Sequence, residues 1–278
     1  MMNKCKKSIR RVLLYALIAA VCVVTNLPLL SMIGTAFKPS SEVMANTSLF
    51  TASPSLENFQ KVAQKTSFPQ AVVNTCLVAL IVAVFCVIFA SMAGVALSRA
   101  RGRLFGGFTM LLLILQMIPS ILIMIPLFST LRALKLVDTH ISLIMIYIAI
   151  NLPFGILTMK GFFDSIPSEL DEAAMIDGAS PYQTYWKIIF PTALPGMISV
   201  AVYTLMSVWN EFTIANIFIQ SPELQTLSVG LRQFQLQTTT DWGAMSAAAA
   251  LGCIPAFLFL IVAQKYLISG MTSGAVKG

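Results

Sequence analysis

The residues best suited to a binding role form a polar stretch between two apolar segments. It contains Glu172-Ala173-Ala174 and Asp177-Gly178, and it continues to Ile188 and Pro191. Five of the eleven acidic residues lie between positions 164 and 177: Asp164, Glu169, Asp171, Glu172 and Asp177. Small side chains and a glycine allow another backbone to approach closely, while the acids keep the stretch in contact with water. This pattern is typical of a docking surface.

Residue types that carry out catalysis or bind metals are scarce. His140 is the only histidine, and the five cysteines have neither C-x-x-C nor metal-ligand spacing. Motifs of the form G-x-S-x-G, H-E-x-x-H and G-x-x-x-x-G-K-[ST] are absent from the sequence. We therefore predict no catalytic residue, no metal site and no cofactor.

The composition indicates a membrane protein. The mean hydropathy is +0.84, with 57% hydrophobic and 10% charged residues. Six windows are long and apolar enough to cross a bilayer. They lie near residues 12–36, 71–97, 105–129, 139–159, 193–219 and 243–266. The predicted fold class is therefore all-α, a polytopic membrane protein of six transmembrane helices in one domain, residues 1–278. We interpret the first window as a retained signal anchor.

The distribution of Lys and Arg predicts that both termini are cytoplasmic. The N-terminal cluster and the short loop with Arg99, Arg101 and Arg103 then face the cytoplasm, as does the polar loop 160–191. The net charge of +7 is explained by these flanking residues, so no nucleic-acid partner is predicted. In the long outer loop, 37–70, apolar residues at helical spacing predict a short helix that either covers the bundle or docks an external partner.

The polar loop itself is predicted to form two short helices. Ser168 and Asp171 fit a capping box at the start of the first helix, and Gly178 is placed to end it. Ser180 and Gln183 fit a second capping box, with Pro181 at the first helical position.

The second helix is expected to end at Pro191. It should present one aromatic and apolar face, formed by Tyr182, Tyr185, Trp186 and Ile189. Tyrosine and tryptophan are common anchors of protein interfaces. The residues alone leave two interpretations open, a surface that docks a partner and a hairpin that folds under its own bundle.

The spacing within this loop resembles a known signature. Glu172-Ala173-Ala174, then Gly178, Ile188 and Phe190-Pro191, is similar to the E-A-A…G…I-x-L-P signature of bacterial ABC importer permeases, with Phe190 in the position where leucine is commonest. The resemblance implies the type I ABC importer permease fold and a coupling helix that sits in a cleft of the ATPase. The implied coupling residues are Glu172, Ala173, Ala174, Asp177, Gly178, Ile188 and Pro191.

Further segments resemble the carbohydrate branch, of the maltose and multiple-sugar type. They are Ile166-Pro167, Trp209-Asn210-Glu211-Phe212 and the tail 269–278. The resemblance implies import of a sugar or oligosaccharide across the bacterial cytoplasmic membrane. The implied partners are an ABC ATPase dimer, a second homologous permease, an extracytoplasmic solute-binding protein and the lipid bilayer.

Polar residues inside the predicted spans are candidates for a translocation pathway: Asn210, Glu211, Gln116 and Asn151. An ionised carboxylate at the bilayer centre is costly, so Glu211 is expected to face protein or water. Two roles remain open for these residues, a polar path for a hydroxylated solute and hydrogen bonding between helices.

Two other transport functions remain as alternatives. One is an ABC permease for a different small polar solute, such as a polyamine, phosphate or an amino acid. The other is a secondary transporter, although that class often shows paired intramembrane charges and repeated halves. Here only one carboxylate lies within a predicted span, and no internal repeat is evident.

Overall fold

The computed structural model describes residues 2–65, 67–100, 102–235 and 240–275. The chain divides into two compact units. The first comprises Met1–Phe68 and Leu231–Cys253, and the second comprises Pro69–Gly230 and Ile254–Gly278. Across the described ranges the regular secondary structure is helical, apart from one isolated bridge between Gln235 and Thr240. The chain is thus of the all-α class.

The first unit is organised around the short helix α2. Its helices are α1 (Met2–Ala36), α2 (Glu57–Lys65), the 3-10 helix η3 (Leu231–Phe234) and the beginning of α13 (Trp242–Ala275). Asn58, which is fully buried, donates to the carbonyls of Ala36 and Lys38 at 3.1 and 2.8 Å. Lys61 lies 3.5 Å from Asp241, just before α13. The helix predicted in the 37–70 loop is thereby confirmed.

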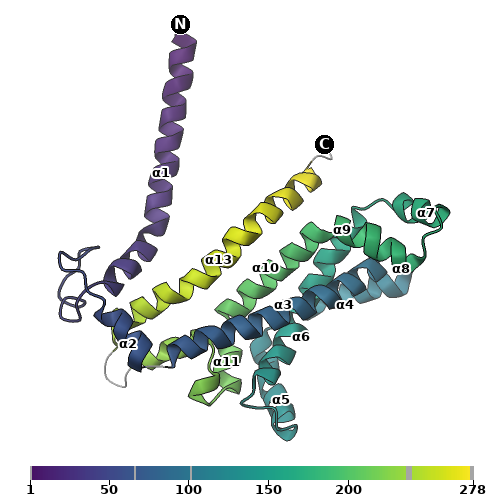
Figure 1. Cartoon of the computed structure of the whole chain (residues 1–278). Helices are drawn as coiled ribbons and strands as arrows, with labels where there is room; N and C mark the ends of the chain where they lie inside the picture. Colours follow the sequence, from purple (N-terminus) through teal and green to yellow (C-terminus); the bar gives the residue numbers. More distant parts are fainter. Residues whose placement is uncertain (1, 66, 101, 236–239, 276–278) are drawn as a thin grey trace. The chain divides into compact units, whose positions relative to one another are not determined.

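The second unit contains most of the remaining helices. They are α3 (Phe68–Arg99), α4 (Arg103–Met117), α5 (Ser120–Ala133), α6 (His140–Asp164), α7 (Glu169–Ile176), α8 (Pro181–Thr184), the π-helix η1 (Tyr185–Ile189), α9 (Phe190–Thr192), α10 (Leu194–Asn210), α11 (Thr213–Phe218), the 3-10 helix η2 (Pro222–Leu224) and α12 (Leu227–Gly230). Helix α6 packs against both α4 and α10. Helices α7 and α8 form an arm at one end of this bundle (Figure 1).

Several helices have the length and composition needed to cross a membrane. Four qualify alone: Arg11–Ala36, Phe68–Arg99, His140–Asp164 and Trp242–Ile261. Two bent pairs, Arg103–Met117 with Ser120–Ala133 and Pro181–Thr192 with Leu194–Asn210, bring the number among the described residues to as many as six. Large apolar side chains are exposed along α1, α3, α4 and α5, as expected for surfaces that contact lipid.

The segment predicted as one span near 105–129 is sharply bent. Helices α4 and α5 meet at an angle of 93°. Pro119 has no N–H to continue the helical ladder, and its ring disfavours helical backbone at the preceding residue. Ile118 is accordingly extended, with φ −76° and ψ 119°. Three further prolines in apolar segments, Pro126, Pro153 and Pro255, lie inside helices.

Small residues let the helices of the second unit pack closely. A Cβ at Gly94 on α3 would lie 2.7 Å from the Met159 Cβ on α6, so a side chain there is excluded. Close backbone approach at small residues is the usual basis of helix association in membranes. Near this contact between α3 and α6 lies a buried cluster that includes Ala90, Met159 and Val200. The α3–α6–α10 core is therefore a tightly packed frame.

One aspartate ties the turn between α5 and α6 to the segment after α11. Asp138 Oδ1 accepts from the backbone N–H groups of Gln220 and Ser221, both at 2.9 Å, and Oδ2 accepts from the Ser221 hydroxyl at 2.5 Å. Its own N–H donates to the Phe218 carbonyl. Hydrogen bonds from Ser221, and then from Gln220, hold the pKa of the Asp138 carboxyl below its usual range.

We predict that Asp138→Ala lowers the free energy of unfolding by roughly 2 kcal/mol, because it removes these acceptors and places alanine at a left-handed φ of 62°. Asp138→Asn should lose less, because asparagine tolerates this conformation and keeps Oδ1. Thermal unfolding in detergent checks this order. Since folding depresses the pKa, the carboxylate contribution should be complete above about pH 4 and disappear only as the pH falls through the folded-state value. Equal melting temperatures for all three proteins would contradict the assignment.

Candidate coupling loop and polar sites

The loop 160–191 is helical for most of its length, but its first helix is not capped as predicted. Ser168 has helical backbone angles, and its side chain makes no capping hydrogen bond to α7. The predicted capping box of Ser168 and Asp171 is therefore wrong. Asp171 Oδ2 instead forms an ion pair with Arg99, which draws the carboxylate toward the end of α3.

The second helix begins as predicted. The Ser180 hydroxyl accepts from the Gln183 N–H at 3.3 Å, and the Gln183 side chain accepts from the Ser180 N–H at 2.9 Å. Both bonds of the capping box are thus present, with Pro181 in the first turn. Between the two helices Gly178 adopts φ 80°, the left-handed conformation that glycine permits.

Pro191 does not end the second helix, which corrects the prediction. The chain passes through a π-helical turn and remains helical to Thr192. Because a π-turn has a wider repeat, it shifts the following side chains around the axis. Ile189 consequently turns inward and is 2% exposed, whereas Phe190 lies 4.8 Å from Trp186 between ring centroids. The aromatic face is therefore formed by Tyr182, Tyr185, Trp186 and Phe190.

The residues predicted to couple to an ATPase divide into two groups. Exposed positions are Glu172, Ala173, Asp177, Gly178 and Pro191. Ala174 is buried and Ile188 is half-buried against the α6–α10 core, so these two support the loop from within.

Several large apolar side chains on the loop are nevertheless exposed, including Met175, Ile176 and Tyr182. A cluster of exposed apolar residues beside acids and small residues is typical of a docking surface.

An arginine from a distant helix anchors this loop. Arg99 lies in the last turn of α3, and its Nε is 2.6 Å from Asp171 Oδ2 on α7. Its Nη1 also donates to the carbonyls of Phe163 and Ile166 at 3.2 Å each. The fork of guanidinium donors thus joins α3, the end of α6 and α7 at one point. From the sequence, Arg99 is predicted only to mark the cytoplasmic side of the membrane, because no local pattern pairs it with residue 171.

We predict that Arg99→Ala loosens the loop by roughly 2 kcal/mol, or about thirty-fold faster amide exchange over residues 165–180, because one carboxylate and two carbonyls lose their partner. Hydrogen-exchange mass spectrometry of the purified protein measures this effect. Arg99→Lys should restore only part of the protection, since a point charge cannot reach all three acceptors.

A matched control is Lys160→Ala, which breaks the exposed Lys160–Asp164 pair, also 2.6 Å long. It should leave the exchange of residues 165–180 unchanged. Wild-type protection in Arg99→Ala would refute the anchoring role.

Glu211 lies at a helix break. The segment predicted as one span near 193–219 forms α10, an extended Glu211 and then α11. One oxygen, Oε1, accepts from the Ile214 N–H at 2.8 Å, while Oε2 accepts from the Ala215 N–H at 3.1 Å and from the Tyr147 hydroxyl at 2.7 Å. The carboxylate therefore satisfies donors that the break exposes and links α6 to α11.

The other three pathway candidates do not form one site with Glu211. Asn210 is exposed, and its amide donates to the Met206 carbonyl of its own helix. Asn151 is buried and donates to the Tyr147 carbonyl. Gln116 lies apart, next to the α4–α5 bend, where it lines a hollow of about 360 Å³. Of the four candidates, all within the described residues, Glu211 alone has a side-chain hydrogen bond to another long helix, to the Tyr147 hydroxyl of α6, whereas the Asn151 amide bonds within α6.

We predict that Glu211→Ala destabilises the protein more than either Glu211→Gln or Tyr147→Phe. Alanine leaves three donors without an acceptor, each worth roughly 1–3 kcal/mol when buried, whereas glutamine keeps one acceptor oxygen. Thermal unfolding of the three variants in nanodiscs checks the order. If Glu211→Ala unfolded at the wild-type temperature, a role in holding the break would be untenable.

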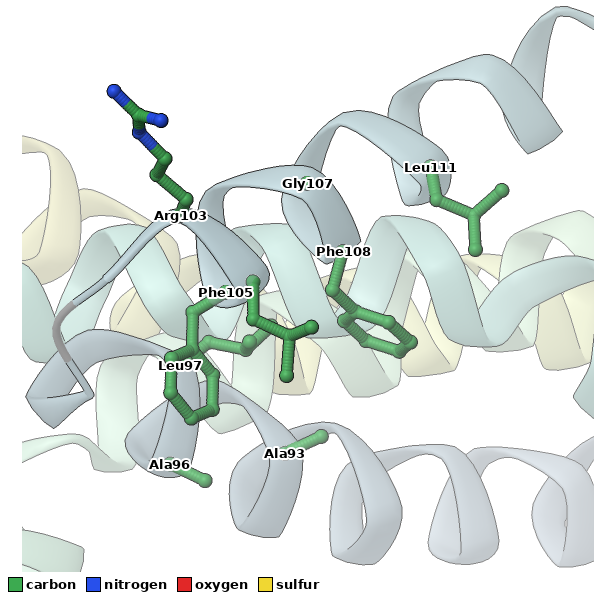
Figure 2. A pocket seen from close by; sticks show the side chains of 9 residues that line it. Ala93, Ala96, Leu97, Arg103, Phe105, Gly107, Phe108 and Leu111 are labelled. Atoms are coloured by element: carbon green, nitrogen blue, oxygen red, sulfur yellow. The ribbon is translucent and has the colours of Figure 1, made fainter.

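A larger groove lies between α3 and α4, with a volume of about 870 Å³. Its lining is apolar except for Arg103, whose guanidinium points away from it (Figure 2). Side chains such as Leu97, Phe105 and Phe108 point into this space. The groove offers no set of hydrogen-bonding groups to a hydroxylated solute, and we exclude it from the candidate pathway.

Comparison with known proteins identifies the class. Residues 87–273 match the family described as "Binding-protein-dependent transport system inner membrane component", and the chain belongs to this family. It is thus a permease of the ABC importer class, a protein of the inner membrane.

The diacetylchitobiose uptake system permease protein DasC of Streptomyces coelicolor is 32% identical over 90% of this chain and 91% of its own length. The trehalose transport system permease protein SugB of Mycobacterium tuberculosis is 33% identical over 91% and 92%.

Solved structures show the same fold. A chain of a bacterial ABC transporter that imports the acidic polysaccharide alginate superposes with a TM-score of 0.81, at 21% identity, covering 94% of this chain and 97% of that one. A chain of the MetNI methionine ABC transporter superposes with a TM-score of 0.61, covering 73% and 95%. The type I ABC importer permease fold expected from the resemblance is confirmed.

Proposed function

We propose that this chain is the permease subunit of an ATP-driven importer, and that it forms half of the translocation pathway for a sugar or oligosaccharide. The observation that carries the proposal is the exposed surface of the loop 160–191, which is joined to the end of α3 through Arg99. Relatives named for the transport of diacetylchitobiose and trehalose support a saccharide as the solute.

In this proposal the chain itself has no catalytic role. A separate ATPase dimer receives α7 and the turn at Gly178, where the exposed Glu172, Ala173 and Asp177 contact it. Ile188 transmits force inward, because it packs against the buried cluster of α6 and α10, and the buried Ala174 supports the loop from within. A second permease completes the pathway, a solute-binding protein delivers the sugar from the opposite side, and both termini lie in the cytoplasm.

Closure of the ATPase dimer would move the loop as a unit. Arg99 joins α7 directly to α3, and Ile189 joins the same loop to the core around α6 and α10. Movement of the loop against the ATPase is therefore passed directly to three long helices, α3, α6 and α10.

The tail 269–278 also resembles the carbohydrate branch. Its backbone is described as far as Ala275, and residues 276–278 lie outside the described part of the chain.

Gentle purification of the tagged chain from its native membrane, followed by mass spectrometry, tests this assignment of partners. Recovery of a P-loop ATPase and a second permease is the expected result. Recovery of the chain alone, in detergents that preserve known importers, would contradict the proposal and favour a self-contained transporter.

We predict that Gly178→Asp lowers ATP-dependent sugar uptake by about ten-fold or more, because it adds a charged side chain to the turn that is proposed to lie closest to the ATPase. Apart from Gly178 and its two chain neighbours, no atom of the described chain lies within 4 Å of a Cβ at this position, so a steric clash must come from a partner.

The matched control is Gly102→Asp. Gly102 also has a positive φ, 120°, and open space around it, but it lies outside the loop. It carries the same added charge and no smaller backbone strain, because φ 120° with ψ 164° is a region that essentially only glycine adopts, and uptake should stay near the wild-type rate. Equal losses in both variants would sink the docking interpretation of Gly178.

A further inference from the structure

The hollow beside the α4–α5 bend combines an aromatic surface with polar groups. Phe154 on α6 and Tyr203 on α10 stack with ring centroids 3.8 Å apart and planes at 26°. Both rings line the hollow, together with Gln116 and Ser120 from the two sides of the bend. Its volume of about 360 Å³ falls within the range of roughly 300–1,000 Å³ typical of small-molecule sites.

The position of this hollow suits a solute in transit. Phe154 and Tyr203 each lie near the middle of a long helix, so the stacked pair lies near the middle of the membrane-spanning bundle. Tyr203 is 44% exposed, and Gln116 and Ser120 are exposed as well. Polar side chains at this depth cost free energy when they face lipid. The side of the hollow formed by Gln116, Ser120 and Tyr203 must therefore face water, protein or a polar ligand.

The backbone around the hollow adds further acceptors. Pro153 lines the wall and has no N–H to donate to the carbonyl of Ala149, which lines it too. At the bend, Pro119 likewise interrupts the ladder, and the Ile118 N–H reaches the Leu115 carbonyl only at 3.4 Å. Irregular backbone at membrane depth is tolerated where it lines a polar cavity.

We infer that this hollow is a saccharide subsite, in which the stacked rings of Phe154 and Tyr203 support the apolar face of one sugar ring. The C–H groups of that face lie against the negative face of the aromatic ring, and burial of the two surfaces excludes water. The amide of Gln116 and the hydroxyls of Ser120 and Tyr203 supply donors and acceptors for the sugar hydroxyls. The inference rests on the proposed function, and it assigns substrate contact to this chain's own residues.

Transport by the complete importer in proteoliposomes tests the subsite, with radiolabelled trehalose and diacetylchitobiose as probes. Tyr203→Leu and Phe154→Leu should lower kcat/KM for uptake by about two- to ten-fold, the worth of one aromatic contact. Tyr203→Phe keeps the ring and should retain most of the activity. The control is Phe85→Leu, which disrupts the exposed Phe85–Phe89 pair on α3, outside the hollow, and should leave uptake unchanged.

A cysteine-protection experiment tests the subsite even if the leucine variants assemble poorly. Ser120→Cys, in a background without the native cysteines, should react with a small thiol reagent more slowly when trehalose or diacetylchitobiose is present. Unchanged uptake in both leucine variants, or a Ser120→Cys reaction that neither sugar slows, would overturn the subsite while leaving sugar import intact. A wild-type importer that carries an amino acid or a polyamine and no saccharide would overturn the proposed function and the subsite together.

Discussion

The fold depends on the requirement that backbone groups at membrane depth find partners within the protein. Continuous helices meet this requirement by themselves, but here two of the spanning segments are interrupted. At the break after α10, the Glu211 carboxylate accepts from two backbone N–H groups and from the Tyr147 hydroxyl. At the bend after α4, the hollow lined by Gln116 is open, and part of its lining is polar. One interruption is closed by a carboxylate, and the other offers its polar groups to a ligand.

The same frame connects the two functional regions. Helices α6 and α10 carry the stacked rings of Phe154 and Tyr203 near their middles and pack around Ile189 of the loop 160–191 at one end. Helix α3 ends in Arg99, which holds α7 of the same loop. In the proposed mechanism, a displacement of the loop would therefore reach the hollow through these packed helices.

Much of this architecture could be predicted from the sequence, because the relevant signals are local. Hydropathy located the long helices, and the Ser180–Gln183 capping box followed from residue spacing alone. The anchoring of Asp171 by Arg99 could not be predicted, since it depends on which helix ends meet. The inward turn of Ile189 was missed because a π-turn changes the helical repeat, which a fixed period of 3.6 residues does not anticipate. Likewise, Glu211 was recognised as unusual, but its bonds to a helix beyond the break were not foreseen.

Site-specific photo-crosslinking in the native membrane would show whether the loop 160–191 docks on an ATPase. A photoreactive phenylalanine analogue would replace Tyr182, which is 72% exposed on the loop, or Phe108, which is 45% exposed on α4. The account predicts an adduct with a P-loop ATPase from position 182 and none from position 108. Absence of that adduct at position 182, in membranes where the assembled importer is active, would contradict the account.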